Sequence, residues 1–90
     1  MVERVPSYLV ETFLARGAAG EREARERQAH SAACALTHVR FERSIYVPED
    51  EICFFVFAAP SGREAALVAQ RAGLDPLRVV EAVSSGEEER

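Results

Sequence analysis

Residues 39–60 read VRFERSIYVPEDEICFFVFAAP and have the pattern of a β-hairpin. Apolar and polar side chains alternate over residues 37–47, and residues 52–59 are apolar almost throughout, so both segments are predicted strands. The segment 48–51, Pro-Glu-Asp-Glu, predicts a tight turn between them. The hairpin therefore supplies two neighbouring strands of an antiparallel sheet.

The register of this hairpin follows from a turn centred on Glu49 and Asp50. The first face then carries the pairs Val47–Ile52, Ile45–Phe54 and Phe41–Ala58, and the second carries Tyr46–Cys53, Ser44–Phe55 and Glu42–Phe57. The second strand of the hairpin, residues 52–59, is thus apolar on both faces. Two helices can cover only one face of a small sheet. We therefore expect Phe55 and Phe57 to lie on the open face, where a second copy of the chain covers them.

The rest of the chain supplies two more strands and two helices. Residues 7–14 alternate as a strand does, with Leu9, Glu11 and Phe13 on one face. Residues 18–36 are rich in Ala, Glu and Arg and predict a helix whose long Arg side chains cover part of the sheet. A second helix follows the capping box formed by Ser61 and Glu64.

The last predicted elements are a C-terminal cap of the second helix and a fourth strand. Gly73 suits the left-handed end of the second helix, and residues 77–83 predict a strand. The order of elements predicts an α+β, ferredoxin-like βαββαβ domain over residues 1–83, with a four-stranded antiparallel sheet and two helices on one face. Residues 84–90 form a short acidic tail that we expect to be disordered.

Composition narrows the classes of function. The net charge of −4 argues against non-specific nucleic-acid binding. The chain has no run of the roughly 18 apolar residues that span a membrane, and no charged-then-apolar signal pattern. Cys34 and Cys53 lie in different predicted elements, without the spacing of a disulfide framework. We expect a cytoplasmic protein with reduced thiols that binds neither nucleic acid nor membranes.

Several short motifs, in order, resemble a bacterial family of small domains of unknown function that includes an actinobacterial nickel-binding protein. They are Tyr-Leu-Val-Glu at 8–11, Val-Arg-Phe at 39–41, Ser44, Ala-Pro at 59–60, Ala-Gly-Leu at 72–74 and Glu-Ala-Val at 81–83. The resemblance covers residues 8–83. It implies a ferredoxin-like homodimer that binds nickel.

Nickel prefers imidazole and other nitrogen or thiolate donors, so histidine and cysteine are the candidate ligands. His30 and Cys34 lie one helical turn apart, a spacing that places two ligands on one ion. His38 begins the strand 37–47 and is the third candidate. The alternative is an exposed pair on a helix surface and a strand-end histidine bonded to a nearby carbonyl.

A second hypothesis is a dimeric α+β barrel enzyme of the isomerase, cyclase or cofactor-free oxygenase type, acting on an apolar small molecule. Glu11, on the open face of a central strand, either forms an ion pair with Arg40 or acts as a general base. In the enzyme, Glu11 or His38 is the base and Arg40 stabilises a developing enolate. The interface or pocket is lined by Tyr46, Cys53, Phe55 and Phe57. A third hypothesis is an interaction module without a pocket.

Overall fold

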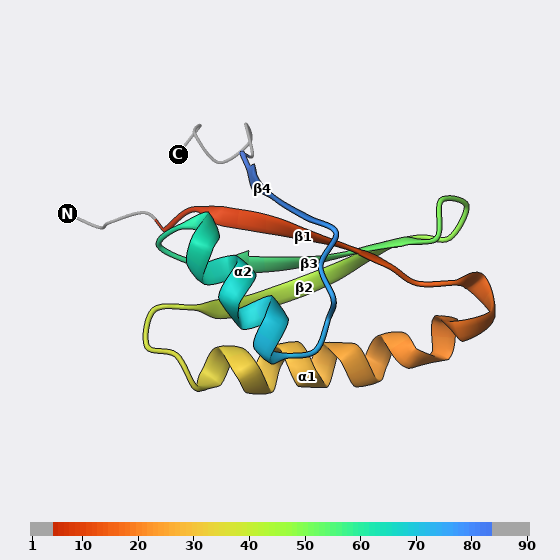
Figure 1. The fold of residues 1–90 in the computed structure, drawn as a ribbon, viewed down its shortest axis with the longest axis horizontal. Helices are drawn as coiled ribbons and strands as arrows, with labels where there is room; N and C mark the ends of the chain where they lie inside the picture. Colours follow the sequence, from red (N-terminus) through yellow and green to blue (C-terminus); the bar gives the residue numbers. More distant parts are fainter. Residues whose placement is uncertain (1–4, 84–90) are drawn as a thin grey trace.

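The computed structural model describes residues 5–83, so the predicted acidic tail at 84–90 lies outside the described residues. Four strands, two α-helices and one 3-10 helix follow in chain order (Figure 1). They are β1 (Ser7–Phe13), η1 (Arg16–Glu21), α1 (Arg22–Cys34), β2 (Arg40–Val47), β3 (Ile52–Ala58), α2 (Gly62–Arg71) and β4 (Arg78–Ala82).

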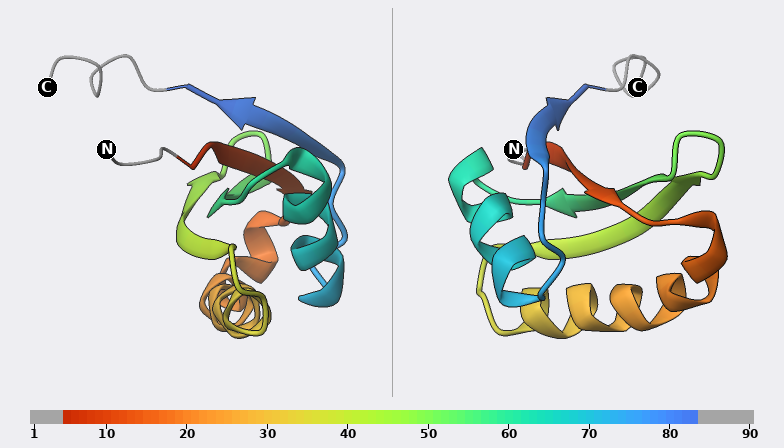
Figure 2. Two further views of the ribbon diagram at one scale, coloured as in Figure 1. Left: turned by 90° about the vertical axis from the view of Figure 1, so that its left-hand side faces the viewer. Right: turned by 45° about the vertical axis from the view of Figure 1, so that its right-hand side comes forward.

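The four strands form one antiparallel sheet in the order β2-β3-β1-β4. Both helices lie on the same face of this sheet, with α1 below β2 and α2 beside β1 and β4 (Figure 2). The structure therefore confirms the α+β class, the antiparallel four-stranded sheet and the placement of both helices on one face. The strand order is the one that a ferredoxin-like arrangement requires.

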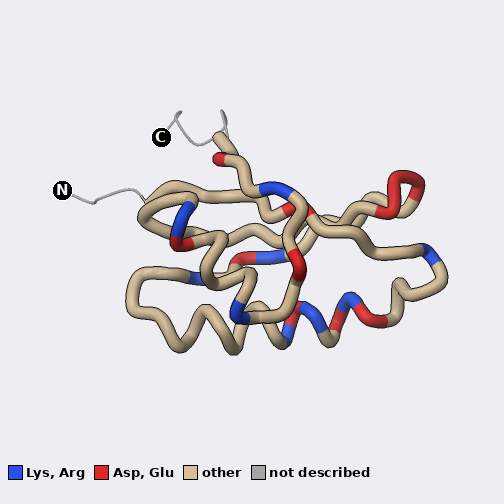
Figure 3. The backbone as a smooth tube through the Cα atoms, in the orientation of Figure 1, with Lys and Arg blue, Asp and Glu red and all other residues tan. Residues whose placement is uncertain are grey.

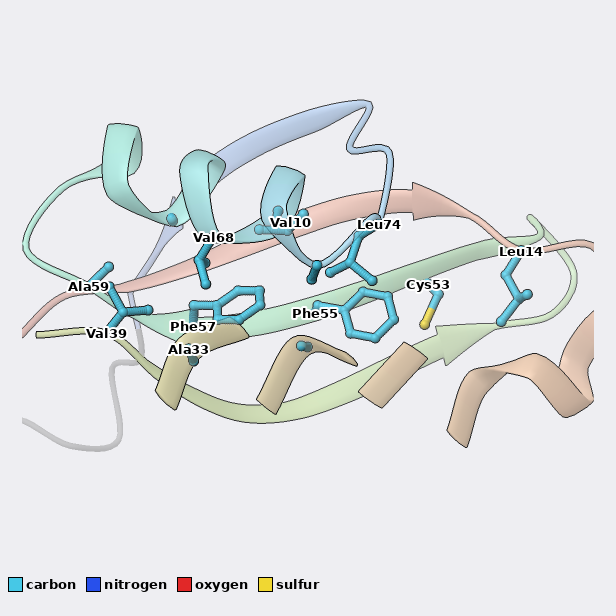
Figure 4. Close-up of a cluster of buried hydrophobic side chains, with 14 residues drawn as sticks. Val10, Leu14, Ala33, Val39, Cys53, Phe55, Phe57, Ala59, Val68 and Leu74 are labelled. Atoms are coloured by element: carbon cyan, nitrogen blue, oxygen red, sulfur yellow. The ribbon is translucent and has the colours of Figure 1, made fainter. Parts of the chain in front are cut away.

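The core between helices and sheet is built from small helical side chains and large strand side chains (Figure 4). The buried residues of α1 are Ala29 and Ala33, and those of α2 are Ala65, Val68 and Ala69. Alanine lets the helices approach the sheet closely but fills little volume. The sheet must therefore provide the bulk of the core, and aromatic rings on β3 do so.

These rings correct the predicted assignment of faces. Phe55, Phe57 and Cys53 are fully buried beneath the helices, and they do not lie on the open face. The prediction was wrong because the polar residues on the same face of β2 find partners inside the protein. Tyr46, for example, packs with its ring against the core while its hydroxyl donates to the Leu14 carbonyl oxygen at 2.9 Å.

The predicted hairpin register is right near the turn and wrong beyond it. The pairs Val47–Ile52, Tyr46–Cys53, Ile45–Phe54 and Ser44–Phe55 are all observed. A β-bulge between Phe41 and Arg43 then inserts one extra residue, so Phe41 opposes Phe57 and Arg40 opposes Ala58. The bulge turns Phe41 into the core, where its ring centroid lies 5.4 Å from that of Phe57.

Local signals at the second helix are confirmed. The Ser61 hydroxyl accepts a hydrogen bond from the Glu64 backbone N–H at 3.3 Å, as the capping box predicts. Gly73 follows the helix with φ of 75°, a left-handed conformation that glycine adopts without steric cost. The first helix begins differently from the prediction, because a 3-10 segment precedes α1.

Candidate functional site

The nitrogen donor and the sulfur donor predicted on the first helix lie next to each other. His30 and Cys34 are both exposed on α1, and the Cys34 Sγ is 3.6 Å from the His30 Nε2. Their common direction follows from the helix itself, because residues four apart share a face while Ala29 and Ala33 face the core. The arrangement presents an imidazole and a thiol side by side to solvent.

The charged residues of α1 lie on one side of this pair. Five charged residues, Arg22, Glu23, Arg25, Glu26 and Arg27, occupy the first half of α1. The second half, which carries His30 and Cys34, has no Lys, Arg, Asp or Glu (Figure 3). Glu26 and Arg27 lie one turn before His30 and line a surface hollow with it, so charged groups flank the pair on its N-terminal side.

His38 lies apart from this pair. It is exposed in the loop between α1 and β2, two residues before the strand that it was predicted to begin. It borders a surface groove of about 620 Å³ whose other lining residues are Val5, Pro6, Thr37, Val39, Arg40, Ala58 and Pro60. Within residues 5–83, no three His, Cys, Asp or Glu side chains are placed to hold one metal ion. The predicted set of three ligands is thus not brought together in one subunit.

Glu11 lies on the open face, as expected, but its partner differs from the predicted one. Its Oε1 is 3.3 Å from the Nε of Arg78, whereas Arg40 pairs with Glu42 at 3.2 Å. The sheet order explains the difference, because β3 separates β1 from β2, whereas β4 is the direct neighbour of β1. The Glu11–Arg40 ion pair was therefore a wrong prediction, and the structural ion pair is Glu11–Arg78.

The groups expected to form a catalytic pocket lie on opposite faces of the sheet. Glu11 and Arg40 share the open face, while Tyr46 contributes to the core under the helices. The remaining predicted lining residues, Cys53, Phe55 and Phe57, are also in that core. A single subunit thus does not bring the predicted base Glu11 and the enolate-stabilising Arg40 together with the predicted apolar lining.

A polar network joins the first helix to the edge strand, and sequence reasoning did not find it. Arg22 donates from Nε to the Ser44 Oγ at 2.9 Å and from Nη2 to the Ser44 carbonyl oxygen at 3.1 Å. The Ser44 hydroxyl in turn donates to the carboxylate of Glu26. The guanidinium carbon of Arg22 also lies 5.9 Å from the centre of the Tyr46 ring. The prediction that Arg side chains cover part of the sheet pointed to this network without naming its partners.

The second cysteine is a core residue. Burial raises the pKa of the Cys53 thiol above its ordinary value of 9.0, while nearby Arg22 and Arg25 act in the opposite direction. A neutral, fully buried thiol is a poor nucleophile and a poor metal ligand. Cys34, which is exposed, is therefore the thiol available for chemistry.

Comparison with known proteins yields no relative. No family model, no curated protein and no solved structure matches the chain. Among residues 5–83, no helix is both long enough and apolar enough to cross a membrane.

Proposed function

We propose that this protein binds a borderline divalent cation at the surface of α1, through the imidazole of His30 and the thiolate of Cys34. The sequence resemblance implies that the cation is nickel. The observation that carries the proposal is the separation of 3.6 Å between the His30 Nε2 and the Cys34 Sγ.

This separation matches the distance between two donors on one ion. With metal–sulfur and metal–nitrogen distances of about 2.3 Å and 2.0–2.1 Å, a tetrahedral ion holds the two donors about 3.5 Å apart. A right angle at the metal, as in tetragonal nickel sites, requires about 3.1 Å. Both side chains are exposed, so they can close that difference by small rotations.

The two residues have simple roles in this proposal. His30 binds through its neutral imidazole, and Cys34 binds as the thiolate after releasing a proton. Water fills the remaining coordination positions. A site with two protein donors on an exposed helix takes up and releases its ion readily, which favours a role in metal buffering or delivery over a structural or catalytic metal centre.

We further propose that the working unit is a cytoplasmic homodimer of ferredoxin-like subunits. Metal binding requires Cys34 to be reduced, which is the normal state of a cytoplasmic thiol. The homodimer is implied by the resemblance and is favoured by the apolar side chains that the sheet leaves uncovered.

The test is calorimetric titration with nickel chloride on wild type and on His30→Ala, Cys34→Ser and His38→Ala. We expect each change in the donor pair to weaken binding strongly, whereas His38→Ala binds as wild type does. Affinity should also be lost in acid, because a protonated imidazole cannot ligate. Absence of nickel binding in wild type, or unchanged binding in the His30→Ala/Cys34→Ser double variant, would refute the proposal.

A further inference from the structure

We propose that the surface groove beside His38 binds a small apolar monocarboxylate, that is, an organic acid with a hydrocarbon body. The groove lies where the segment before β1, the segment that leads into β2 and the end of β3 meet. Its volume of about 620 Å³ is within the range of about 300–1,000 Å³ that small-molecule sites have. The proposal does not depend on metal binding, because neither His30 nor Cys34 lines this groove.

The lining of the groove combines one polar segment with apolar side chains from other parts of the chain. Its polar residues, Thr37, His38 and Arg40, all come from the segment 37–40. Its apolar residues are Val5, Pro6, Val39, Ala58 and Pro60. Sites for small organic molecules are mostly apolar, with a few polar groups that fix the orientation of the ligand. The groove therefore suits a ligand that has one polar end and a hydrocarbon body.

The polar segment of the groove favours an anion. The hydroxyl of Thr37, the imidazole of His38 and the guanidinium of Arg40 can all donate hydrogen bonds. No Asp or Glu lines the groove, although the chain as a whole has 15 acidic and 11 basic residues. The one permanent charge in the lining is therefore positive, and it belongs to a group that binds carboxylates through paired hydrogen bonds.

The guanidinium of Arg40 has donors to spare for a ligand. Its side chain is 74% exposed and contacts Glu42 through Nη2 alone, at 3.2 Å. Its Nε and Nη1 make no hydrogen bond to the residues 5–83 that the structure describes. An ion pair as exposed as this one is weak, so the carboxylate of Glu42 does not prevent a second carboxylate from binding.

The balance of charge and apolar lining selects a monocarboxylate rather than a phosphate or a dicarboxylate. One guanidinium matches one negative charge, whereas a second charge on the ligand would lie against apolar side chains and lose its hydration without a partner. A hydrocarbon body instead covers Val5, Pro6 and Pro60 and removes apolar surface from water. Inorganic phosphate has no such body and leaves this part of the groove empty.

The test is a titration of the full isotope-labelled chain with hexanoate, followed by the amide signals in NMR spectra, with EDTA present to remove metal ions. We expect saturable shifts at residues 37–40 and 58, and much weaker binding of the neutral analogue hexanamide and of inorganic phosphate. Arg40→Gln should weaken hexanoate binding about tenfold, because it removes a charge-assisted hydrogen bond. Arg43→Gln is the matched control, because it removes the same charge from an exposed position of β2 outside the groove, and it should bind as wild type does.

Three results would overturn the proposal. Hexanamide that binds as tightly as hexanoate would remove the role of the anion, and phosphate that binds as tightly would remove the role of the apolar lining. Equal weakening by Arg40→Gln and Arg43→Gln would show a response to general charge rather than a site. Nickel titration of Arg40→Gln should match wild type, because His30 and Cys34 lie on α1, so failure of one site is distinguishable from failure of the other.

Discussion

At the scale of single residues, the two cysteines differ because of their surroundings rather than their chemistry. Cys34 is the last residue of α1 and is exposed beside the His30 imidazole, whereas Cys53 is buried in the core. The same residue type therefore yields a candidate metal ligand in one place and a small apolar core side chain in the other.

The raised pKa of Cys53 predicts a specific dependence of stability on pH. Burial holds the folded-state pKa above the ordinary 9.0, so the folded protein binds the thiol proton more tightly than the unfolded chain does. The resulting stabilisation is fully present below the pKa of the unfolded chain and is lost as pH rises through the folded pKa. We expect the free energy of unfolding to fall as pH rises past the ordinary thiol pKa of 9.0, and to fall less steeply in Cys53→Ala.

Urea denaturation at several pH values provides the measurement. Cys34→Ser serves as the control, because its thiol is exposed and its removal should leave the alkaline slope unchanged. Equal slopes in wild type and Cys53→Ala would contradict the prediction.

At the scale of elements, the packing of α1 against the sheet depends on few apolar contacts. Its only buried side chains are Ala29 and Ala33, so apolar burial contributes little to docking this helix. The hydrogen bonds of Arg22 and Glu26 to Ser44 supply a directional attachment at the other end of the helix. Ser44 on β2 therefore attaches α1 to the sheet rather than facing another molecule.

This attachment predicts that Ser44→Ala destabilises the protein. The substitution removes the hydroxyl that accepts from Arg22 and donates to Glu26, both of which retain partial access to water and can be hydrated again. We therefore expect a loss of about 1–2 kcal/mol in the free energy of unfolding. Ser31→Ala, at an exposed position of α1, is the control and should cost nothing. A Ser44→Ala variant as stable as wild type would show that the network does not hold the helix.

At the scale of the whole molecule, the two faces of the sheet carry different sets of side chains. The face under the helices carries the aromatic core, and the open face carries apolar side chains together with Glu11 on β1 and Arg side chains on the edge strands. We expect substitutions of the side chains under the helices to destabilise the subunit itself.

Phe57→Ala tests how much the side chains under the helices stabilise the subunit. It removes a fully buried ring that packs on Phe41, and large-to-small substitutions of this kind cost about 3–5 kcal/mol. Thermal and urea denaturation should show this loss at every protein concentration, because the ring stabilises the subunit itself. Leu67→Ala, 39% exposed on α2, should change stability by less than about 1 kcal/mol. A loss that disappears at high protein concentration would instead place Phe57 at a dimer interface.

The features that depend on neighbouring residues could be predicted from the sequence alone. The order of strands and helices, the hairpin pairing from Val47 to Ser44, and the caps at Ser61 and Gly73 are all local, because alternation, turn chemistry and capping act over a few positions. The spacing of His30 and Cys34 likewise placed two donors together, since helix geometry brings residues four apart to one face.

The face of the sheet that lies inside depends on contacts between segments that are distant in the chain. A strand apolar on both sides fits either face, and the choice depends on whether Ser44 and Tyr46 find partners from distant segments, as they do with Arg22 and Leu14. The bulge that turns Phe41 inward follows from the same choice. The pairing of Glu11 with Arg78 depends on strand order, which joins residues 67 positions apart and leaves no local signal in the chain.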